Sequence, residues 1–281
     1  MPDAMKKLLS LLFLACMTCG AAVAHTPVEV KVISYNIRTM ARDGDNRWTH
    51  RRHATRNMLN RHTPDLFGLQ EAMKPHLRYL DKSFPQYSRV GVGRDNGKMS
   101  GEVMAIYYNT ERFDLLDSGT FWLSETPDEV SKGWDASHKR TVTWVHVRDR
   151  ASRKELYYFN THLDHRSRVA QAESLKLIVE RIKEIAGTEA AVILGGDFNV
   201  VPGDEVLAPL DAFMQAARAT AAATEAKGTF NGFSRHTQRS VIDHVYYRGS
   251  DVKCYEYRVL DGDYGAPYIS DHYPIEVVLA L

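Results

Sequence analysis

Segments with the character of β-strands greatly outnumber helical segments along this chain of 281 residues. Their apolar runs are rich in β-branched and aromatic residues, which is typical of strands packed in a sheet. Residues 50–62 and 167–185 instead read as helices, the second clearly amphipathic. The pattern favours two packed sheets flanked by helices over an all-parallel sheet, which would need a helix after nearly every strand. The predicted strands are residues 28–37, 65–70, 103–108, 141–147, 155–160, 190–194, 241–247, 252–259 and 273–279.

The composition, with 44% hydrophobic and 25% charged residues, predicts one globular domain. The first 24 residues differ, because Lys6 and Lys7 precede an apolar run and then small residues up to Ala24. This order is typical of a secretory signal, so we expect residues 1–24 to be a signal peptide and residues 25–281 to form the domain. The sequence therefore predicts an exported protein, periplasmic or secreted. Lipid attachment at Cys16 or Cys19 is a less favoured alternative.

The charge of the predicted mature chain argues against tight binding of duplex nucleic acid. Removing residues 1–24 takes away two lysines and one aspartate from 36 basic and 35 acidic residues, which leaves 34 of each. Proteins that bind long nucleic acid usually carry a basic face. Arg51, Arg52, Arg56 and Arg61 form a basic segment, which we interpret as the solvated face of a helix. Only Cys254 remains, so no internal disulfide is expected.

Polar residues recur where the predicted strands begin or end. Each one alone has a structural explanation, such as a turn or a helix cap. The whole set is harder to explain by packing, because sheets deliver residues at strand ends to a shared rim. Carboxylate, carboxamide and imidazole groups at one rim are typical of a metal-assisted phosphoester hydrolase. The residues in question are Asn36, Glu71, His162, Asp164, Asp197, Asn199, Asp243, His244, Asp271 and His272.

Six short motifs in order resemble those of the endonuclease/exonuclease/phosphatase superfamily. They are Ser34-Tyr35-Asn36-Ile37, Gln70-Glu71, Asn160-Thr161-His162-Leu163, Gly196-Asp197-Phe198-Asn199, Ile242-Asp243-His244 and Ser270-Asp271-His272-Tyr273-Pro274. The resemblance covers essentially the whole mature chain and points to the DNase I-like, exported bacterial members. It implies an α/β (α+β) four-layer sandwich, with two packed mixed β-sheets flanked by helices.

The resemblance also implies roles for individual residues. Asn36, Glu71 and Asp271 would hold Mg2+ or Mn2+, which prefer oxygen ligands. Asp197 would activate the attacking water, while Asn199 would donate to a phosphate oxygen. Asp243 would orient His272, which would bind the phosphate or act as a base. His162 would face the leaving group, and its pairing with Glu102 is expected to raise the pKa of His162.

Several functions remain open within this family. The resemblance predicts an exported nuclease or phosphodiesterase, with a phospholipid (sphingomyelinase-like) or sugar or inositol phosphate phosphatase as the alternative. A non-catalytic binding protein is disfavoured because all six motifs are intact. The expected partner is a phosphoester substrate, with nucleic acid and a phospholipid headgroup as candidates, and we expect a monomer without a stable membrane span. Arg94 and Arg140 are candidate phosphate contacts, although a solvated surface position is favoured for both.

Overall fold

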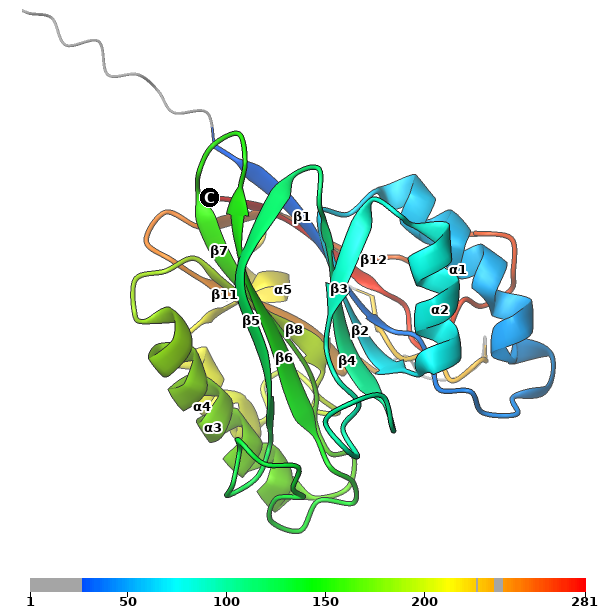
Figure 1. The fold of residues 1–281 in the computed structure, drawn as a ribbon, viewed down its shortest axis with the longest axis horizontal. Coiled ribbons are helices and arrows are strands. Elements are labelled where there is room, and N and C mark those ends of the chain that lie inside the picture. Colours follow the sequence, from blue (N-terminus) through cyan, green and yellow to red (C-terminus); the bar gives the residue numbers. More distant parts are fainter. Residues whose placement is uncertain (1–26, 226, 235–239) are drawn as a thin grey trace, which may run out of the picture.

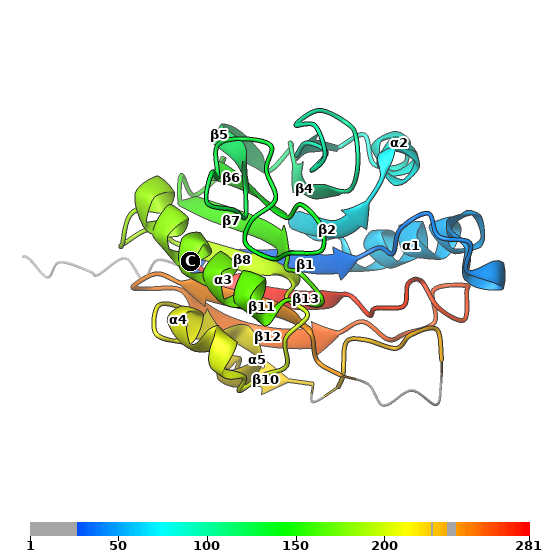
Figure 2. The ribbon, with the colours of Figure 1, turned by 90° about the horizontal axis from the view of Figure 1, so that it is seen from below.

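The computed structural model describes residues 27–281 apart from 226 and 235–239, and the thirteen strands of this part of the chain form two sheets. The predicted signal peptide lies outside the described residues. The seven-stranded sheet has the order β10 (Ala223–Thr224), β12 (Lys253–Val259), β13 (Ile275–Ala280), β1 (Glu29–Asn36), β2 (Leu66–Ala72), β4 (Val103–Asn109) and β3 (Tyr87–Val90). The six-stranded sheet has the order β5 (Phe113–Trp122), β6 (Thr141–Asp149), β7 (Glu155–His162), β8 (Val192–Asp197), β11 (Asp243–Arg248) and β9 (Gln215–Ala216). Figure 2 shows much of the seven-stranded order from top to bottom.

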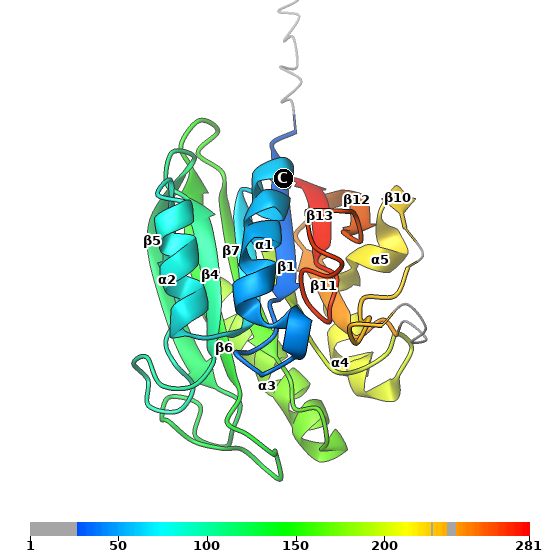
Figure 3. The ribbon, with the colours of Figure 1, turned by 90° about the vertical axis from the view of Figure 1, so that its right-hand side faces the viewer.

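The two sheets pack face to face, with helices on their outer faces (Figure 1). Helices α1 (Trp48–His62) and α2 (Lys74–Ser83) cover the seven-stranded sheet and face the viewer in Figure 3. Helices α3 (Arg168–Ala186) and α4 (Ala208–Asp211) cover the six-stranded sheet, and the short α5 (Ala217–Thr220) lies beside β11 and β12. Short 3-10 turns, η1 (Gly44–Asn46) and η2 (Glu205–Leu207), complete the helical elements of the described chain. The expected four-layer sandwich is confirmed.

Successive side chains of a strand point to opposite faces of its sheet, and the apolar ones form three separate layers. On β1, Val30 and Val32 point into the core between the sheets, while Ile33 and Tyr35 point toward α1. This follows from the two-residue period of a strand, which sends neighbouring side chains to opposite faces. A third layer packs α3 against the outer face of the six-stranded sheet. Because both sheets are covered on both faces, their central strands read as continuous apolar runs in the sequence.

Strand directions bring the ends of six segments to one edge of the sandwich. β1 and β2 run parallel, as do β7 and β8, so each pair ends at the same edge. β13 and β11 run antiparallel to these pairs, so the residues at their beginnings reach that same edge. In the six-stranded sheet the register places His162 beside Asp197 and Asp197 beside Asp243. The topology thus assembles motifs that are far apart in sequence.

The predicted strands and helices are present, with ends shifted by a few residues. The strands β3, β5, β9 and β10 and the helices α2, α4 and α5 were not predicted. Arg51 corrects the interpretation of the basic segment, because it is almost fully buried and donates to the carbonyl oxygens of Ile37 and Ile269. Arg56 and Arg61 are exposed as expected. Within the described residues, none of the helices has the length and apolar character needed to cross a membrane.

Candidate active site

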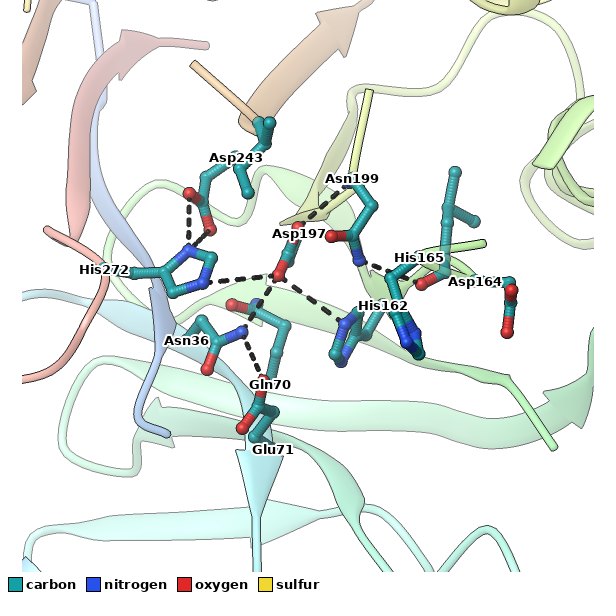
Figure 4. A network of polar contacts seen from close by, with 12 residues as sticks. Asn36, Gln70, Glu71, His162, Asp164, His165, Asp197, Asn199, Asp243 and His272 are labelled. Atoms are coloured by element: carbon teal, nitrogen blue, oxygen red, sulfur yellow. Dashed lines mark hydrogen bonds and ion pairs between the residues drawn. The ribbon is translucent and has the colours of Figure 1, made fainter. Parts of the chain in front are cut away.

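The nine residues to which the resemblance assigns a role meet at the shared edge of the two sheets, around a cavity of about 510 Å³. Seven of these nine line the cavity: Glu71, Glu102, His162, Asp197, Asn199, Asp271 and His272. The other two, Asn36 and Asp243, are buried behind it and hydrogen-bond to residues that line it. Figure 4 shows this network from close by.

Asp243 holds the imidazole of His272 in a fixed orientation. Nδ1 of His272 lies 2.9 Å and 3.1 Å from the two carboxylate oxygens of Asp243, and both side chains are buried. Nε2 of His272 then points toward Asp197, at 3.7 Å from Oδ2. Burial by itself would lower the pKa of His272, but Asp243 and Asp197 raise the pKa well above its usual value. The two carboxylates therefore favour the protonated form of His272.

Asp197 lies at the centre of the network. Its Oδ2 accepts a hydrogen bond of 2.9 Å from the amide of Asn36, and its Oδ1 accepts one of 3.0 Å from the backbone N–H of Asn199. Nε2 of His162 lies 3.5 Å from Oδ2. Burial raises the pKa of Asp197, and the nearby Asp243 raises it further. A carboxylate with a raised pKa accepts a proton more readily, which is what a general base requires.

Glu71 reaches the cavity because its backbone leaves the regular strand geometry. Its φ is +58°, in the left-handed region, at a register irregularity of β2 against β4. Strained backbone of this kind is often concentrated at functional sites. The carboxylate accepts hydrogen bonds from the amide of Asn36 at 3.1 Å and from the backbone N–H of Thr39 at 2.8 Å. Both contacts fix the direction in which Glu71 presents its oxygens.

Asn36 has a positioning role in this arrangement. Its amide nitrogen donates to both Glu71 and Asp197, and its Oδ1 accepts from the backbone N–H of Arg38 at 3.0 Å. The carboxamide thereby holds the two acidic groups at a set spacing. That Asn36 also binds a metal stays a prediction.

Asp271 also lines the cavity, next to Arg38. Its Oδ2 lies 3.4 Å from Nη1 of Arg38, and its Oδ1 accepts from the hydroxyl of Ser270 at 3.2 Å. Burial raises the pKa of Asp271, and His272 and Arg38 partly offset this. Arg38 was not singled out from the sequence, although it lies two residues after Asn36 and lines the cavity.

Glu102 corrects one expectation. Its carboxylate forms a 2.7 Å ion pair with Arg94, whereas Nδ1 of His162 lies 3.8 Å away, without a hydrogen bond. Burial, followed by Arg140 and Arg94, lowers the pKa of His162 well below its usual value. The expected net rise in the pKa of His162 is therefore not found: Glu102 lies nearby, but its carboxylate pairs with Arg94.

Arg94 and Arg140 are not solvated surface residues, because only 8% and 4% of each residue is exposed and both line the cavity. Nη2 of Arg140 lies 3.3 Å from Nδ1 of His165, which lines the cavity too. Asp164 instead forms a turn before α3, where it accepts from the backbone N–H groups of Arg166 and Ser167. His138 and Phe230 also line the cavity, and no motif pointed to them because they lie in loops.

His244 is structural, because neighbouring residues of a strand point to opposite faces and it follows Asp243. Its side chain points away from Asp243, and Nε2 lies 2.7 Å from the carbonyl oxygen of Val200. The ring stacks on Phe198 with centroids 5.1 Å apart.

The donor groups of the cavity fit a hard divalent cation. Glu71 and Asp271 both present carboxylates to it, and oxygen ligands are those that Mg2+ and Mn2+ prefer. Asp197, Asp243 and His272 also lie close enough to share a metal, with ligand atoms within 4.8 Å. In this second group Nδ1 of His272 already contacts both oxygens of Asp243, and its raised pKa favours the protonated form. The group of Asp197, Asp243 and His272 is therefore the poorer candidate, and Glu71 and Asp271 remain the predicted ligands.

Comparisons with known proteins agree with this geometry. A family model described as "Endonuclease/Exonuclease/phosphatase family" matches residues 33–272, a range that holds all nine predicted site residues. A curated relative, an uncharacterized protein of Acanthamoeba polyphaga mimivirus, is 25% identical over 256 residues, with 83% of this chain and 92% of the relative covered.

Two solved structures from Bacteroides thetaiotaomicron are similar over nearly their whole length. One is described as an endonuclease/exonuclease/phosphatase family protein; it is 34% identical, the match covers 91% of this chain and 98% of that one, and the TM-score is 0.84. The other is described as a mannosyl-6-phosphatase; it is also 34% identical, with 90% of this chain and 100% of that one covered and a TM-score of 0.84.

Proposed function

Because this chain belongs to the endonuclease/exonuclease/phosphatase family, we propose that it is a metal-dependent hydrolase of phosphate esters of small sugars. The observation that carries the reaction type is the buried row of Asp243, His272 and Asp197, which opens into a cavity beside Glu71 and Asp271. A general base, a cationic imidazole and acidic oxygens at one cavity are the groups that phosphoester hydrolysis requires.

Two observations favour a small sugar phosphate as the substrate. The cavity of about 510 Å³ has the size of a small-molecule site. The similar solved structure described as a mannosyl-6-phosphatase has a substrate of this class in its name. The earlier expectation of a nuclease stays a prediction, and so does that of a phospholipid esterase.

The chain's own side chains account for most of the steps. Asp197 accepts a proton from the attacking water, because burial and Asp243 raise the pKa of Asp197. His272, held by Asp243, donates from Nε2 to a phosphate oxygen and offsets its negative charge. Asn199 lines the cavity and keeps its amide in place by donating to the carbonyl oxygen of Leu163 at 3.2 Å. Mg2+ or Mn2+ bound by Glu71 and Asp271, with Asn36, would supply charge neutralisation of the transferred phosphoryl group.

A substrate panel tests the proposal directly. The purified protein is incubated with mannose 6-phosphate, a single-stranded oligonucleotide, sphingomyelin vesicles and bis(p-nitrophenyl) phosphate, with Mg2+, with Mn2+ and with EDTA. We expect metal-dependent phosphate release from mannose 6-phosphate, which EDTA abolishes. Faster cleavage of the oligonucleotide would instead favour the nuclease, and turnover of no phosphoester would contradict the proposal.

We also propose that residues 1–24 direct export and are removed after Ala24. The support is the order of charged, apolar and small residues at the N-terminus. Expression of the full chain in a bacterial host, followed by fractionation and mass spectrometry, should recover a protein that begins at His25 outside the cytoplasm. A cytoplasmic product that retains Met1 would contradict it.

A further inference from the structure

One side of the cavity carries four basic side chains that the proposed reaction does not use. They are contributed by three separate connections: between β3 and β4, between β5 and β6, and after β7. We call them the basic wall: Arg94, His138, Arg140 and His165, all of which line the cavity.

The two arginines are held rigidly in place. The carbonyl oxygen of Arg94 accepts from the indole of Trp122 at 2.8 Å, and its backbone N–H donates to the carbonyl oxygen of Glu102 at 2.9 Å. The carbonyl oxygen of Arg140 accepts from the backbone N–H of Leu123 at 2.8 Å. A buried cation on a rigid backbone is already positioned for a ligand, so little ordering is needed on binding.

The positive charge of the wall is only partly matched by protein groups. Glu102 pairs with Arg94, but the nearest carboxylate of Arg140, that of Asp164, lies 3.7 Å from Nε. Asp164 is already occupied by donors from Ser137 and from the turn before α3. Among the described residues, Nε and Nη1 of Arg140 have no hydrogen-bond partner. Buried charged donors without partners are costly, which favours an anionic ligand at this place.

The pKa values of the two histidines in the wall are affected by the charges of the arginines beside them. Partial burial, followed by the charges of nearby arginines, lowers the pKa of His138 and of His165. The neighbouring arginines therefore disfavour the protonated form of both rings. The two rings stack with centroids 6.0 Å apart at the rim.

The ring of His162 lies between Asp197 and Glu102, the carboxylate that pairs with Arg94. Nε2 of His162 lies 3.5 Å from Asp197, while its Nδ1 lies 3.8 Å from Glu102 on the other side. Arg94 is a further 2.7 Å beyond the same Glu102 oxygen. Figure 4 shows His272, Asp197, His162 and His165 in this order across the site. A phosphate that contacts Asp197 and His272 leaves the wall free for another group.

We propose that the basic wall binds a second anionic group of the substrate, so that the preferred sugar phosphate carries another phosphate or a carboxylate. The inference rests on the proposed function for the identity of the reacting group. The wall itself is tested without any hydrolysis.

Binding of inorganic phosphate to the metal-free protein tests the wall without catalysis. In EDTA the carboxylates of Glu71, Asp197 and Asp271 oppose an anion at the reaction centre while His272 attracts one, so the difference in calorimetric titration between the unaltered protein and a wall variant measures the contribution of the basic wall. We expect Arg140→Gln to weaken binding about tenfold to hundredfold, the range for a hydrogen bond to a charged group, and Arg140→Lys to restore part of it. Arg150→Gln, at an exposed arginine outside the cavity, is the control and should bind as the unaltered protein does.

Two outcomes of that titration would overturn the proposal: no phosphate binding by the unaltered protein, or equal binding by Arg140→Gln. If Arg140→Gln does not fold, judged by circular dichroism, His138→Glu serves instead. His138 is exposed at the rim, so the new carboxylate perturbs no core and should also weaken binding.

Hydrolysis then tests the consequence for the substrate. We expect kcat/KM for mannose 1,6-bisphosphate to exceed that for mannose 6-phosphate by about tenfold or more, chiefly through KM, and Arg140→Gln to bring this ratio close to one. Comparing 6-phosphogluconate with glucose 6-phosphate shows whether a carboxylate serves as well. If Arg140→Gln lowered kcat/KM equally for both substrates of a pair, the proposal would be overturned, because the wall would then bind the reacting phosphate. Hydrolysis of no substrate would contradict the proposed function alone, and the titration would still decide on the wall.

Discussion

Single residues at the cavity have chemical roles that depend on one or two contacts each. Asp197 illustrates this, since hydrogen bonds from Asn36 and Asn199 fix its orientation, while burial and Asp243 raise its pKa. The residue could be identified from the Gly-Asp-Phe-Asn motif. Its raised pKa could not, because that depends on burial and on Asp243, which is distant in sequence.

Replacing Asp197 by Asn should separate catalysis from folding. Asn has the same shape but cannot accept a proton, so kcat should fall by about two to four orders of magnitude. Removing a buried charge with a raised pKa should leave the melting temperature unchanged or higher. Steady-state assays and calorimetry measure the two effects. Turnover within a few-fold of the unaltered protein would remove Asp197 from the proposed mechanism.

Glu102 should act on the basic wall and not on the protonation of His162. Glu102→Gln removes the carboxylate that pairs with Arg94 at 2.7 Å, so inorganic phosphate should bind the metal-free protein several-fold more tightly. The pH–rate profile should keep its alkaline limb, because burial and the arginines already hold the pKa of His162 well below its usual value. A shift of that limb to lower pH would instead support the original pairing of Glu102 with His162.

At the scale of elements, the central strands could be predicted and the peripheral elements could not. β1, β8 and β13 are buried on both faces, so each appears as an apolar run. β5 is an edge strand in which Leu115 and Leu116 are both exposed, so its apolar residues do not follow the alternation of a strand, and α2 is only ten residues long. The left-handed backbone of Glu71 could not be predicted either, since nothing in Gln70-Glu71 indicates an irregularity in the strand.

The start of α2 should make the stability of the protein depend on pH. Nδ1 of His76 accepts from the backbone N–H of Met73 at 2.9 Å, and the ring packs edge-on against Trp48. Burial lowers the pKa of His76 from 6.5 to about 3. The unfolded chain therefore binds a proton below pH 6.5 that the folded chain refuses until about pH 3, so the stabilising contribution of neutral His76 is present above 6.5 and lost as pH falls.

His76→Gln tests this contribution. Gln keeps an acceptor for the N–H of Met73 at the same helical position but does not titrate. Between pH 6 and pH 4 the free energy of unfolding should fall more steeply in the unaltered protein, by up to about 1.4 kcal/mol per pH unit, than in the variant. Urea denaturation at several pH values measures the two slopes. If the free energy of unfolding had the same pH dependence in both proteins, His76 would not be the cause of the loss of stability at low pH.

At the scale of the whole molecule, the site exists only because two sheets meet at a set distance. One sheet carries Asn36 and Glu71, and the other carries His162, Asp197 and Asp243. Between them Asn160 accepts from the amide of Gln70 at 2.7 Å and donates to the carbonyl oxygens of Leu69 and Ala105. The order of the motifs predicted which residues meet, but the distance between the two sheets depends on these contacts across the core.

The two sheets approach each other closely at Gly68. A Cβ at this position would lie 2.3 Å from Oη of Tyr158 and 2.8 Å from Cγ of Asn160, so the facing strands would have to move. We expect Gly68→Ala to lower the free energy of unfolding by about 1–3 kcal/mol, as overpacking does. It should also lower kcat, because Glu71 and Asp197 belong to different sheets. Gly262→Ala, whose new Cβ would meet nothing closer than 3.4 Å, is the matched control and should change neither quantity.

The double variant Gly68→Ala/Tyr158→Phe decides whether sheet spacing is the cause. Removing Oη of Tyr158 takes away the closest contact of the new methyl group, while Asn160 remains close. Tyr158→Phe should therefore restore part of both the stability and the turnover lost in Gly68→Ala, because residues in contact are not additive. Denaturant titration and kcat for the four proteins complete the cycle. Additive losses in stability and activity would mean that the two positions act separately, and that the spacing of the sheets at Gly68 does not control the cavity.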